Sequence, residues 1–337
     1  MPTNFSAGPN FKFRSLKKKR ENADQSVMNS EYLDYWGLEK DPFHLAPDEE
    51  MMYLGGQYYE CFERLLYAVN TNKGGALIVS EEAGLGKTTI LLKLIGELRA
   101  EYGDRFRYAM VDHPTLTVSQ MVASIHAGLT NTRPDDDKFR NLLAIKETLL
   151  ELKRFGGRAL IIVDEGQLLC DRKDVLQELR ILLNLTHSKE YLLTVILSGQ
   201  RPLWNTVKSI PEFWQRLPVK YYLIPLTFEE TKALIECRLS KGGLDDERDI
   251  FTTEALEIIH RFSKGLPRTV VALSDLALLV GFSYQATKIG FKEISKAINA
   301  MSGKGDSLPY VAEKVTAPQD EPDSSSFISN IIRRIRG

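Results

Sequence analysis

The sequence predicts an α/β fold in which a five-stranded parallel sheet has helices on both faces and is followed by a smaller helical part. Two observations support this prediction. Short apolar runs alternate with helical patterns over the first two thirds of the chain, and such alternation is typical of a parallel sheet. After Pro225 the patterns are helical only. A chain of 337 residues with 43% hydrophobic content is long enough to bury a core in each part.

The predicted strands are short and apolar, and a helical pattern follows most of them. The strands are expected at 76–79, 108–111, 160–163, 192–197 and 221–224, and the helices among them at 88–101, 117–129, 137–155, 173–186 and 202–209. Four more helices are expected at 228–241, 252–263, 267–282 and 290–301. Thr227 and Thr252 stand before acidic residues, in the order that begins many helices. We therefore expect an α/β domain over residues 31–225 and a helical domain over residues 226–303.

A loop with two glycines follows the first predicted strand and leads into a helix. Gly84 and Gly86 let main-chain N–H groups approach an anion, and the helix that follows adds its dipole at the same point. Lys87 can reach the β- and γ-phosphates of a nucleotide, and the Thr88 hydroxyl can hold Mg²⁺. The residues predicted to bind the nucleotide here are Ala83, Gly84, Leu85, Gly86, Lys87, Thr88 and Thr89.

Two acidic residues, Asp164 and Glu165, come directly after the third predicted strand. Behind a phosphate-binding loop, Asp164 is expected to hold Mg²⁺ directly or through water. Glu165 is expected to polarise the water that attacks the γ-phosphate. The alternative is a pair of solvated turn residues. An acid beside the metal-binding aspartate favours an ATPase over a protein that only stores nucleotide.

Composition restricts the compartment and the partners. The formal net charge of −1 gives the whole molecule no bias towards nucleic acid or membrane, so such contacts need local patches. Three widely spaced cysteines, Cys61, Cys170 and Cys237, form no metal-type spacing and favour reduced thiols. No apolar run approaches the roughly 20 residues of a membrane span, and no apolar segment follows the basic N-terminal stretch as in a secretory signal. These features predict a cytoplasmic protein.

Both ends of the sequence differ in composition from its middle. Residues 1–30 are polar, and six basic residues between Lys12 and Arg20 give this part a local net charge of +4 against Glu21 and Asp24. Residues 304–326 are rich in Gly, Ser, Pro, Asp and Glu, which predicts a flexible linker. Residues 327–337 place isoleucines at helical spacing among arginines, which predicts a cationic amphipathic tail or, alternatively, a frayed terminus.

Further motifs complete a resemblance to a known family. They are Tyr-Trp-Gly-Leu-Glu-Lys-Asp-Pro-Phe at 35–43, Asp-Glu-Gly-Gln-Leu-Leu at 164–169, Leu-Ser-Gly-Gln at 197–200 and Gly-Leu-Pro-Arg at 265–268. Together with the loop at 83–89, they resemble the AAA+ ATPases, and among these the ExeA/GspA-like branch, which includes TnsC-like transposition ATPases. The resemblance covers Tyr32 to Met301. It implies a P-loop NTPase fold with a helical lid, and ATP and Mg²⁺ as ligands.

The resemblance also implies roles for individual residues. Ser198 matches the polar sensor that touches the γ-phosphate or the attacking water, with Gln200 as a rival. Arg268 matches the lid arginine that contacts the nucleotide across the two domains, or it could cap a helix. Arg216 matches the arginine that is inserted into a neighbour's site, with Arg201 as a competitor, and it could instead pair with a surface acid. The catalytic set implied in this way is Glu165, Lys87, Ser198, Arg216 and Arg268.

Some features depart from the family pattern, or have an open role within it. Glu81 stands where the family usually has glycine, and Glu82 follows it, so two carboxylates lie near the expected triphosphate unless they point away or contact the lid. Trp36, Pro42 and Phe43 are expected to pack the start of the domain and not to touch adenine. Secretion-type members continue into a membrane span and a wall-binding module, which this sequence lacks, and this favours a soluble partner.

The sequence leaves two classes of function open. The first is an ATP-controlled ring or helical oligomer that assembles on double-stranded DNA and recruits a transposase or targeting protein. Its phosphate contacts would come from residues 12–20 and from Lys138, Arg140, Lys153 and Arg154. The second is an ATPase of a membrane-associated secretion, pilus or polysaccharide-export system, with the tail on an anionic membrane surface. The sequence features favour the first. A nucleotide-binding switch without hydrolysis is a third possibility, against which Glu165 argues.

Overall fold

The computed structural model describes residues 31–112, 114–245 and 248–303. Its centre is a sheet of five parallel strands in the order β2-β3-β6-β1-β7. The strands are β1 (Ala76–Ser80), β2 (Phe106–Val111), β3 (Arg158–Val163), β6 (Thr194–Gln200) and β7 (Val219–Leu223). β1 lies between β6 and β7, and every one of its residues is buried. The predicted fold class is confirmed.

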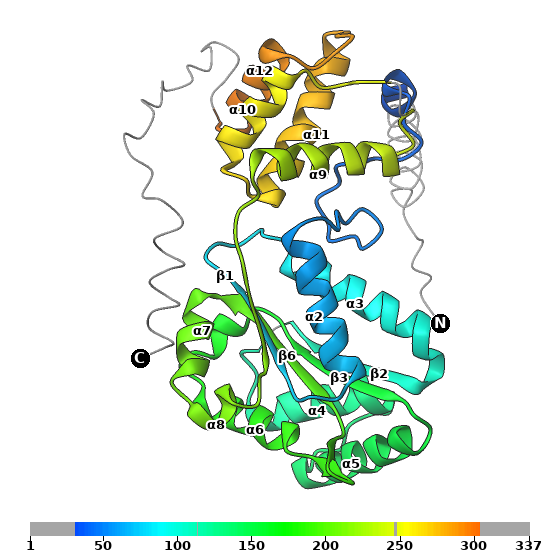
Figure 1. Cartoon of the computed structure of the whole chain (residues 1–337), viewed down its shortest axis with the longest axis vertical. Coiled ribbons are helices and arrows are strands. Elements are labelled where there is room, and N and C mark those ends of the chain that lie inside the picture. Colours follow the sequence, from blue (N-terminus) through cyan, green and yellow to red (C-terminus); the bar gives the residue numbers. More distant parts are fainter. Residues whose placement is uncertain (1–30, 113, 246–247, 304–337) are drawn as a thin grey trace, which may run out of the picture.

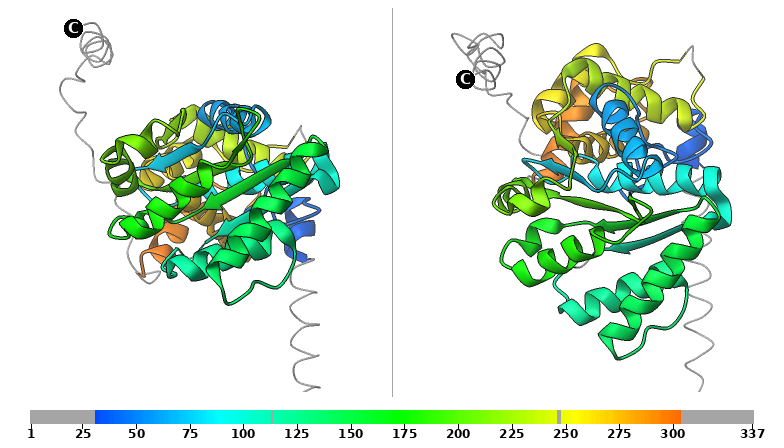
Figure 2. Two further views of the ribbon diagram at one scale, coloured as in Figure 1. Left: turned by 90° about the horizontal axis from the view of Figure 1, so that it is seen from below. Right: turned by 60° about the horizontal axis from the view of Figure 1, so that its bottom comes forward.

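Alternate residues of the strands face opposite sides of the sheet and belong to two hydrophobic cores. Ile78, Leu160 and Ile196 pack towards α2 (Gln57–Asn70) and α3 (Lys87–Tyr102). Leu77, Ile161 and Val195 pack on the other face, which four helices cover. These are α4 (Val118–Thr130), α5 (Lys138–Arg154), α6 (Lys173–Leu183) and α7 (Arg201–Lys208). Figure 2 shows α2 and these four helices on opposite sides of the sheet.

Four helices form the lid, which lies at the opposite end of the molecule from α5 (Figure 1). They are α9 (Phe228–Lys241), α10 (Thr253–Ser263), α11 (Pro267–Ser283) and α12 (Phe291–Met301). Thr227 begins α9 with a capping box in which its hydroxyl accepts from Glu230 N–H and the Glu230 carboxylate accepts from Thr227 N–H. Thr252 caps α10 with one hydrogen bond, in which its hydroxyl accepts from the N–H of Ala255. Both helix starts agree with the sequence prediction.

Residues 31–54, here called the leading segment, pack against the lid. The indole N–H of the fully buried Trp36 donates to the Leu278 carbonyl at 3.1 Å. Glu39 N–H donates to Gly242 O at 2.8 Å, and Lys241 Nζ donates to Met52 O at 2.6 Å. Pro42 and Phe43 are buried as well, so the expectation that this motif packs the start of the domain agrees with the structure.

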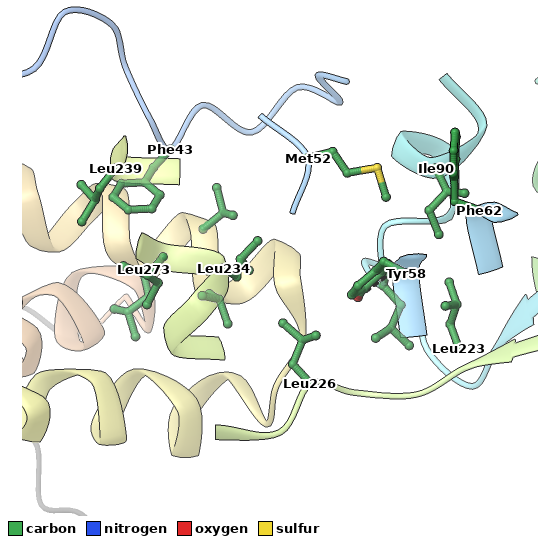
Figure 3. Close-up of a cluster of buried hydrophobic side chains, with 14 of the residues drawn as sticks. Phe43, Met52, Tyr58, Phe62, Ile90, Leu223, Leu226, Leu234, Leu239 and Leu273 are labelled. Atoms are coloured by element: carbon green, nitrogen blue, oxygen red, sulfur yellow. Dashed lines mark hydrogen bonds between the residues drawn. The ribbon is translucent and has the colours of Figure 1, made fainter. Parts of the chain in front are cut away.

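One hydrophobic core joins the leading segment, the lid and the face of the sheet that packs against α2 and α3. Figure 3 shows Phe43 and Met52 from the leading segment, Leu234 and Leu273 from the lid, and Tyr58 from α2 in the same cluster. Leu226, in the connection between β7 and α9, lies between these groups. The lid is therefore attached to the sheet through shared packing as well as through the chain.

Smaller features were not predicted from the sequence. α2 was missed, although Tyr58, Phe62 and Leu65 follow helical spacing on its buried side. The predicted helix over 173–186 ends at Leu183, because β4 (Thr186–His187) and β5 (Glu190–Tyr191) form a hairpin there. The short helix α8 (Pro211–Trp214) was missed too. The predicted segments 1–30, 304–326 and 327–337 lie outside the described residues.

No helix within 31–112, 114–245 and 248–303 is long and apolar enough to cross a membrane.

Gly265 should be essential for the connection between the lid and the sheet. Gly265 has a φ of +72°, and a Cβ on this residue would overlap the carbonyl oxygen of Leu226. The N–H of Leu226 in turn donates to the carbonyl oxygen of Gly265 at 2.9 Å. Gly265→Ala should lower the free energy of unfolding by about 3 kcal/mol or more, since neither main-chain segment can move without breaking this contact. The measurement is urea unfolding followed by circular dichroism.

Gly103→Ala is the matched control for this substitution. Gly103 also has positive φ (+54), but nothing lies within 4 Å of an added Cβ. Gly103→Ala should therefore lower the free energy of unfolding only through the unfavourable main-chain conformation, by about 1 kcal/mol. Equal costs for the two variants would contradict the steric argument.

Candidate functional site

The phosphate loop forms the floor of a pocket between the sheet and the lid. Gly84 and Gly86 have φ of +83 and +80, a region that other residues rarely adopt. α3 begins directly after Gly86, and no side chain caps its first turn. The free N–H groups of that turn can therefore bind an anion, as the sequence predicted.

The predicted loop residues do not all face the pocket. Those that line it are Ala83, Gly84, Gly86, Lys87, Thr88 and Thr89. The Leu85 side chain instead points into the core and is fully buried, while its carbonyl oxygen accepts from the Tyr58 hydroxyl at 3.3 Å. Leu85 can contribute to the site through its main chain, and α2 supports the loop from below.

The ammonium of Lys87 lies at the bottom of the pocket. Only 8% of Lys87 is exposed, and its Nζ donates to the Ser80 hydroxyl at 2.6 Å. Burial lowers the pKa of Lys87, whereas the nearby carboxylates of Asp164 and Glu165 act in the opposite direction. A buried cation with one neutral partner is favourably placed to bind a phosphate oxygen.

Asp164 connects three elements at the carboxyl edge of the sheet. One of its carboxylate oxygens accepts from the Thr88 hydroxyl at 2.6 Å and the other from the Ser198 hydroxyl at 2.7 Å. Thr88 lies in the first turn of α3, Asp164 follows β3 and Ser198 lies in β6. The structure therefore brings together the two predicted metal ligands and the predicted sensor. Hydroxyl and carboxylate oxygens are ligands that Mg²⁺ prefers, so this donor set fits the ion.

Glu165 adopts an unusual main-chain conformation. Its φ and ψ are 50° and 33°, the left-handed region, which is uncommon for a residue other than glycine. Its side chain is exposed and lines the pocket beside Gln200. Backbone strain of this kind costs on the order of 1 kcal/mol and is often found at functional sites.

Glu81 turns away from the pocket, in contrast to the repulsion that the sequence suggested as one possibility. Its carboxylate accepts from Arg201 Nη1 at 3.0 Å and from the Tyr222 hydroxyl. These hydrogen bonds, with that of Tyr222 the stronger influence, lower the pKa of Glu81. Its partners lie on α7 and β7 and not on the lid. The charge that was expected to oppose a triphosphate is thus balanced by Arg201.

The leading segment and the lid form the remaining walls of the pocket. The leading segment contributes His44, Leu45, Ala46 and Pro47, and the lid contributes Leu234, Arg238, Pro267, Arg268 and Val271. Arg238 is buried, and its Nη1 donates to the Pro42 carbonyl at 3.0 Å. These walls are mainly apolar, whereas the floor is polar. This division suits a ligand with a flat base at one end and phosphates at the other.

Arg268 contacts the phosphate loop directly. Its N–H donates to Gly84 O at 3.2 Å, and its Cβ lies 3.0 Å from where a Cβ on Gly84 would be. The side chain is exposed and lines the pocket. The predicted lid arginine therefore lies beside the predicted phosphate site.

Arg216 lies apart from the other predicted site residues. Its carbonyl oxygen accepts from Gly75 N–H at 2.9 Å, directly before β1, whereas the phosphate loop follows the other end of that strand. At about 3.3 Å per residue, the five residues of β1 separate the two by roughly 16 Å. The Arg216 guanidinium donates to the Tyr191 hydroxyl at 3.0 Å. Arg216 therefore cannot reach the pocket of its own chain. Arg201, in contrast, directly follows Gln200, which lines that pocket.

Sequence reasoning missed the pocket residues that lie outside motifs. His44, Leu234, Arg238 and Val271 are separated along the chain and meet only because the leading segment packs on the lid. Gln167, which follows Glu165 in the same motif, was also not assigned a role, although the Asp-Glu-Gly-Gln sequence pointed to it. Its contacts are described below.

Comparison with known proteins agrees with this site. Residues 70–207 match the AAA domain family. The general secretion pathway protein A of Aeromonas hydrophila is 31% identical over 278 residues, which cover 82% of this chain and 49% of that protein. The chain thus spans about half the length of that relative. An uncharacterized HTH-type transcriptional regulator of Methanocaldococcus jannaschii is 26% identical over 156 residues, or 45% of this chain and 37% of that protein.

Solved structures show the same fold at low sequence identity. The Aeropyrum pernix ORC1 protein in complex with DNA superposes with a TM-score of 0.60 at 14% identity, covering 78% of this chain and 69% of that one. The Thermotoga maritima RuvB Holliday junction branch migration motor has a TM-score of 0.51 at 17% identity, covering 84% and 78%. These likenesses concern the fold.

Proposed function

Because the chain belongs to the ExeA/GspA-like branch of the AAA+ ATPases, we propose that it binds ATP with Mg²⁺ and hydrolyses it, and that hydrolysis controls its assembly into oligomers. The observation that carries this proposal is the set of contacts around Asp164, with Lys87 and Glu165 on either side of it. A site for nucleotide binding alone would not need a second carboxylate beside the metal ligand.

The triphosphate binds along the loop of residues 83–89. The N–H groups of the first turn of α3 hold the phosphate oxygens, and the Lys87 ammonium leaves the Ser80 hydroxyl for the β- and γ-phosphates. Thr88 and Asp164 would hold Mg²⁺, which supplies charge neutralisation between the β- and γ-phosphates when bound. The base occupies the apolar end of the pocket between His44 and Leu234.

Hydrolysis needs one water in line with the bond to be broken. Glu165 accepts a proton from this water as its oxygen attacks the γ-phosphorus, and the bond to the β-phosphate oxygen breaks. Ser198 is fully buried and donates to the Asp164 carboxylate, so it would sense the γ-phosphate through Asp164. Gln200, which lines the pocket, is the second candidate for the sensor. Arg268, at the start of the lid helix α11, contacts the phosphates, so that the position of the lid depends on the nucleotide.

An arginine from a second copy completes the site. Arg216 lies at the far end of β1 from the pocket of its own chain and does not reach that pocket, which is consistent with a role in the site of a neighbouring copy. An arginine supplied in this way stabilises the charge that develops on the transferred phosphoryl group. The proposed unit of activity is therefore an oligomer.

For the system that this ATPase serves, we propose assembly of a membrane-associated secretion, pilus or polysaccharide-export apparatus. This proposal rests on the relative at 31% identity, which is named for the general secretion pathway. Three of the four basic residues that the sequence offered for DNA phosphates on the outer helices are paired with acidic residues. Lys138 pairs with Glu178 at 2.6 Å, Arg140 pairs with Asp135 at 3.2 Å, and Lys153 pairs with Glu190.

Assembly on double-stranded DNA with recruitment of a transposase or targeting protein is the second candidate. The observation that favours it is the group of six basic residues at 12–20, outside the described residues. Arg154, exposed at the end of α5, is the remaining candidate for a phosphate contact. The sequence-based preference for DNA stays a prediction.

The chemistry is tested by two substitutions in the site. Glu165→Gln should bind ATP with unchanged affinity and lose turnover about 100-fold or more, since a positioned base contributes at least that factor. Lys87→Ala should weaken ATP binding at least about tenfold, a loss of about 1.4 kcal/mol. Steady-state phosphate release and titration with a fluorescent ATP analogue measure the two quantities.

Two variants of similar chemistry serve as controls. Glu82→Gln changes an exposed acidic residue directly before the phosphate loop, and Lys93→Ala changes a lysine on the outer part of α3. Both should behave like the parent protein. If Glu165→Gln keeps the turnover of the parent, Glu165 is not the base.

The shared site is tested by mixing inactive variants. Arg216→Ala and Glu165→Gln proteins should regain activity when mixed, because one kind of interface then joins an intact Glu165 to an intact Arg216. Lys87→Ala mixed with Glu165→Gln should regain none, since Lys87 and Glu165 line the pocket of the same chain and every site in the mixture then lacks one of them. Specific activity of the parent should also rise with protein concentration. Turnover by a monomer would rule out the shared site.

The two systems are separated by the surface that the protein binds. With ATP, the secretion-type proposal predicts binding to vesicles that contain anionic lipid, lost on deletion of residues 327–337, and no response to duplex DNA. The DNA alternative predicts ATP-dependent binding to duplex DNA that weakens steeply with salt and depends on residues 1–30. Co-sedimentation with vesicles and fluorescence anisotropy with labelled DNA, each at several salt concentrations, distinguish these outcomes.

A further inference from the structure

We propose that Gln167 is a positioning residue for hydrolysis, which holds the Glu165 carboxylate and connects it to the carboxyl end of β6. This inference rests on the proposed ATP hydrolysis and adds to it the group that places the base. Gln167 lies in η2 (Gly166–Leu169), a short helical turn directly after Glu165. The side chain is half-buried and is not among the residues that line the pocket.

The carboxamide of Gln167 makes two hydrogen bonds at its two ends. Its Nε2 donates to a carboxylate oxygen of Glu165, and its Oε1 accepts from Gln200 N–H at 3.0 Å. Only one orientation of the amide satisfies both contacts. A flipped amide would set its oxygen against the Glu165 carboxylate and its NH₂ against the Gln200 N–H. The two contacts therefore determine each other.

Close packing holds the bridge in place. A Cβ on Gly199 would lie 2.8 Å from Gln167 Oε1 and 3.0 Å from Gln167 N, so glycine leaves the room that this side chain fills. On the neighbouring Gly166, a Cβ would lie 2.8 Å from a Leu203 methyl group and 3.0 Å from Ser198 O. η2 thus lies directly against the end of β6 and the start of α7.

The bridge connects two walls of the nucleotide pocket. Glu165 and Gln200 both line the pocket, and Gln167 joins them from behind. The hydrogen bond between Ser198 and Asp164 makes a second connection between the end of β3 and β6. A displacement of the Gln200 main chain would therefore be transmitted through Gln167 to the Glu165 carboxylate. Without this bridge the exposed Glu165 side chain would sample several rotamers.

Two substitutions separate the contacts. Gln167→Glu keeps an oxygen for the Gln200 N–H but places a carboxylate against Glu165, while Gln167→Met keeps the length and loses both contacts. Both should lower kcat by on the order of tenfold to hundredfold, part of the factor that a positioned base supplies. The affinity for a fluorescent ATP analogue should stay within about threefold of the parent, since Gln167 does not face the nucleotide.

A double-substitution cycle distinguishes positioning from general damage. In the Glu165→Gln background, Gln167→Glu should lower the residual turnover by no more than about twofold, because Gln167 acts through Glu165. Gln177→Glu is the matched control. Gln177 is exposed on α6, and its Oε1 accepts from Arg180 Nε at 3.3 Å, so the change keeps an acceptor and should leave kcat unchanged.

Amide exchange gives a readout that does not need turnover. The Gln200 amide should exchange slowly in the parent and in Gln167→Glu, and faster in Gln167→Met. A parent that does not hydrolyse ATP refutes the proposed function, and the exchange rates then decide whether the bridge exists. A parent that hydrolyses ATP, with both Gln167 variants at parental kcat or with equal exchange in all three proteins, overturns this inference.

Discussion

The position of the lid over the phosphate loop depends on one shared hydrophobic core. Residues of the lid, the leading segment and α2 belong to the same cluster as Ile78 and Ile162 of the sheet. Each large apolar side chain that is fully buried contributes about 1.5–3 kcal/mol. A single main-chain hydrogen bond such as that from Arg268 to Gly84 contributes about 1 kcal/mol. The core therefore determines the position of the lid, and the contact between Arg268 and the phosphate loop follows from it. A lid that opens must pivot within this packing.

The leading segment connects the lid to the pocket, because it packs against the lid and also lines the pocket. The Trp36 indole ties this segment to the lid main chain, and the Lys241 and Arg238 side chains of the lid hold the main chain of the segment. The segment then supplies His44 to Pro47 to the pocket wall. In the proposed ATP complex, the base would lie between the leading segment and the lid. A movement of the lid would then change the contacts of the base as well as those of Arg268 with the phosphate loop.

The sequence was sufficient for the features that repeat along the chain or that belong to short motifs. The strands β1, β3 and β6 could be predicted because they are buried on both faces and read as continuous apolar runs. The lid helices could be predicted from their amphipathic patterns, and Thr227 and Thr252 mark the starts of α9 and α10. Pairings between distant residues could not be predicted. Glu81 looked unfavourable by its position alone, and only the fold brings it to Arg201 and Tyr222. Arg238 and His44 meet for the same reason, since the path of the leading segment across the lid is a matter of packing.

The polar groups of the site are paired with one another before any ligand is considered. Lys87 donates to Ser80, Thr88 and Ser198 donate to Asp164, and Gln167 donates to Glu165. Buried polar groups without partners would destabilise the fold, so these pairs allow a polar pocket floor beneath an apolar core. A ligand must replace such bonds with stronger ones. Phosphate oxygens can do so for Lys87, because an ion pair with hydrogen bonding is stronger than a bond to a neutral hydroxyl. Neutral ligands cannot, so the resting pairs make the floor of the pocket selective for anions.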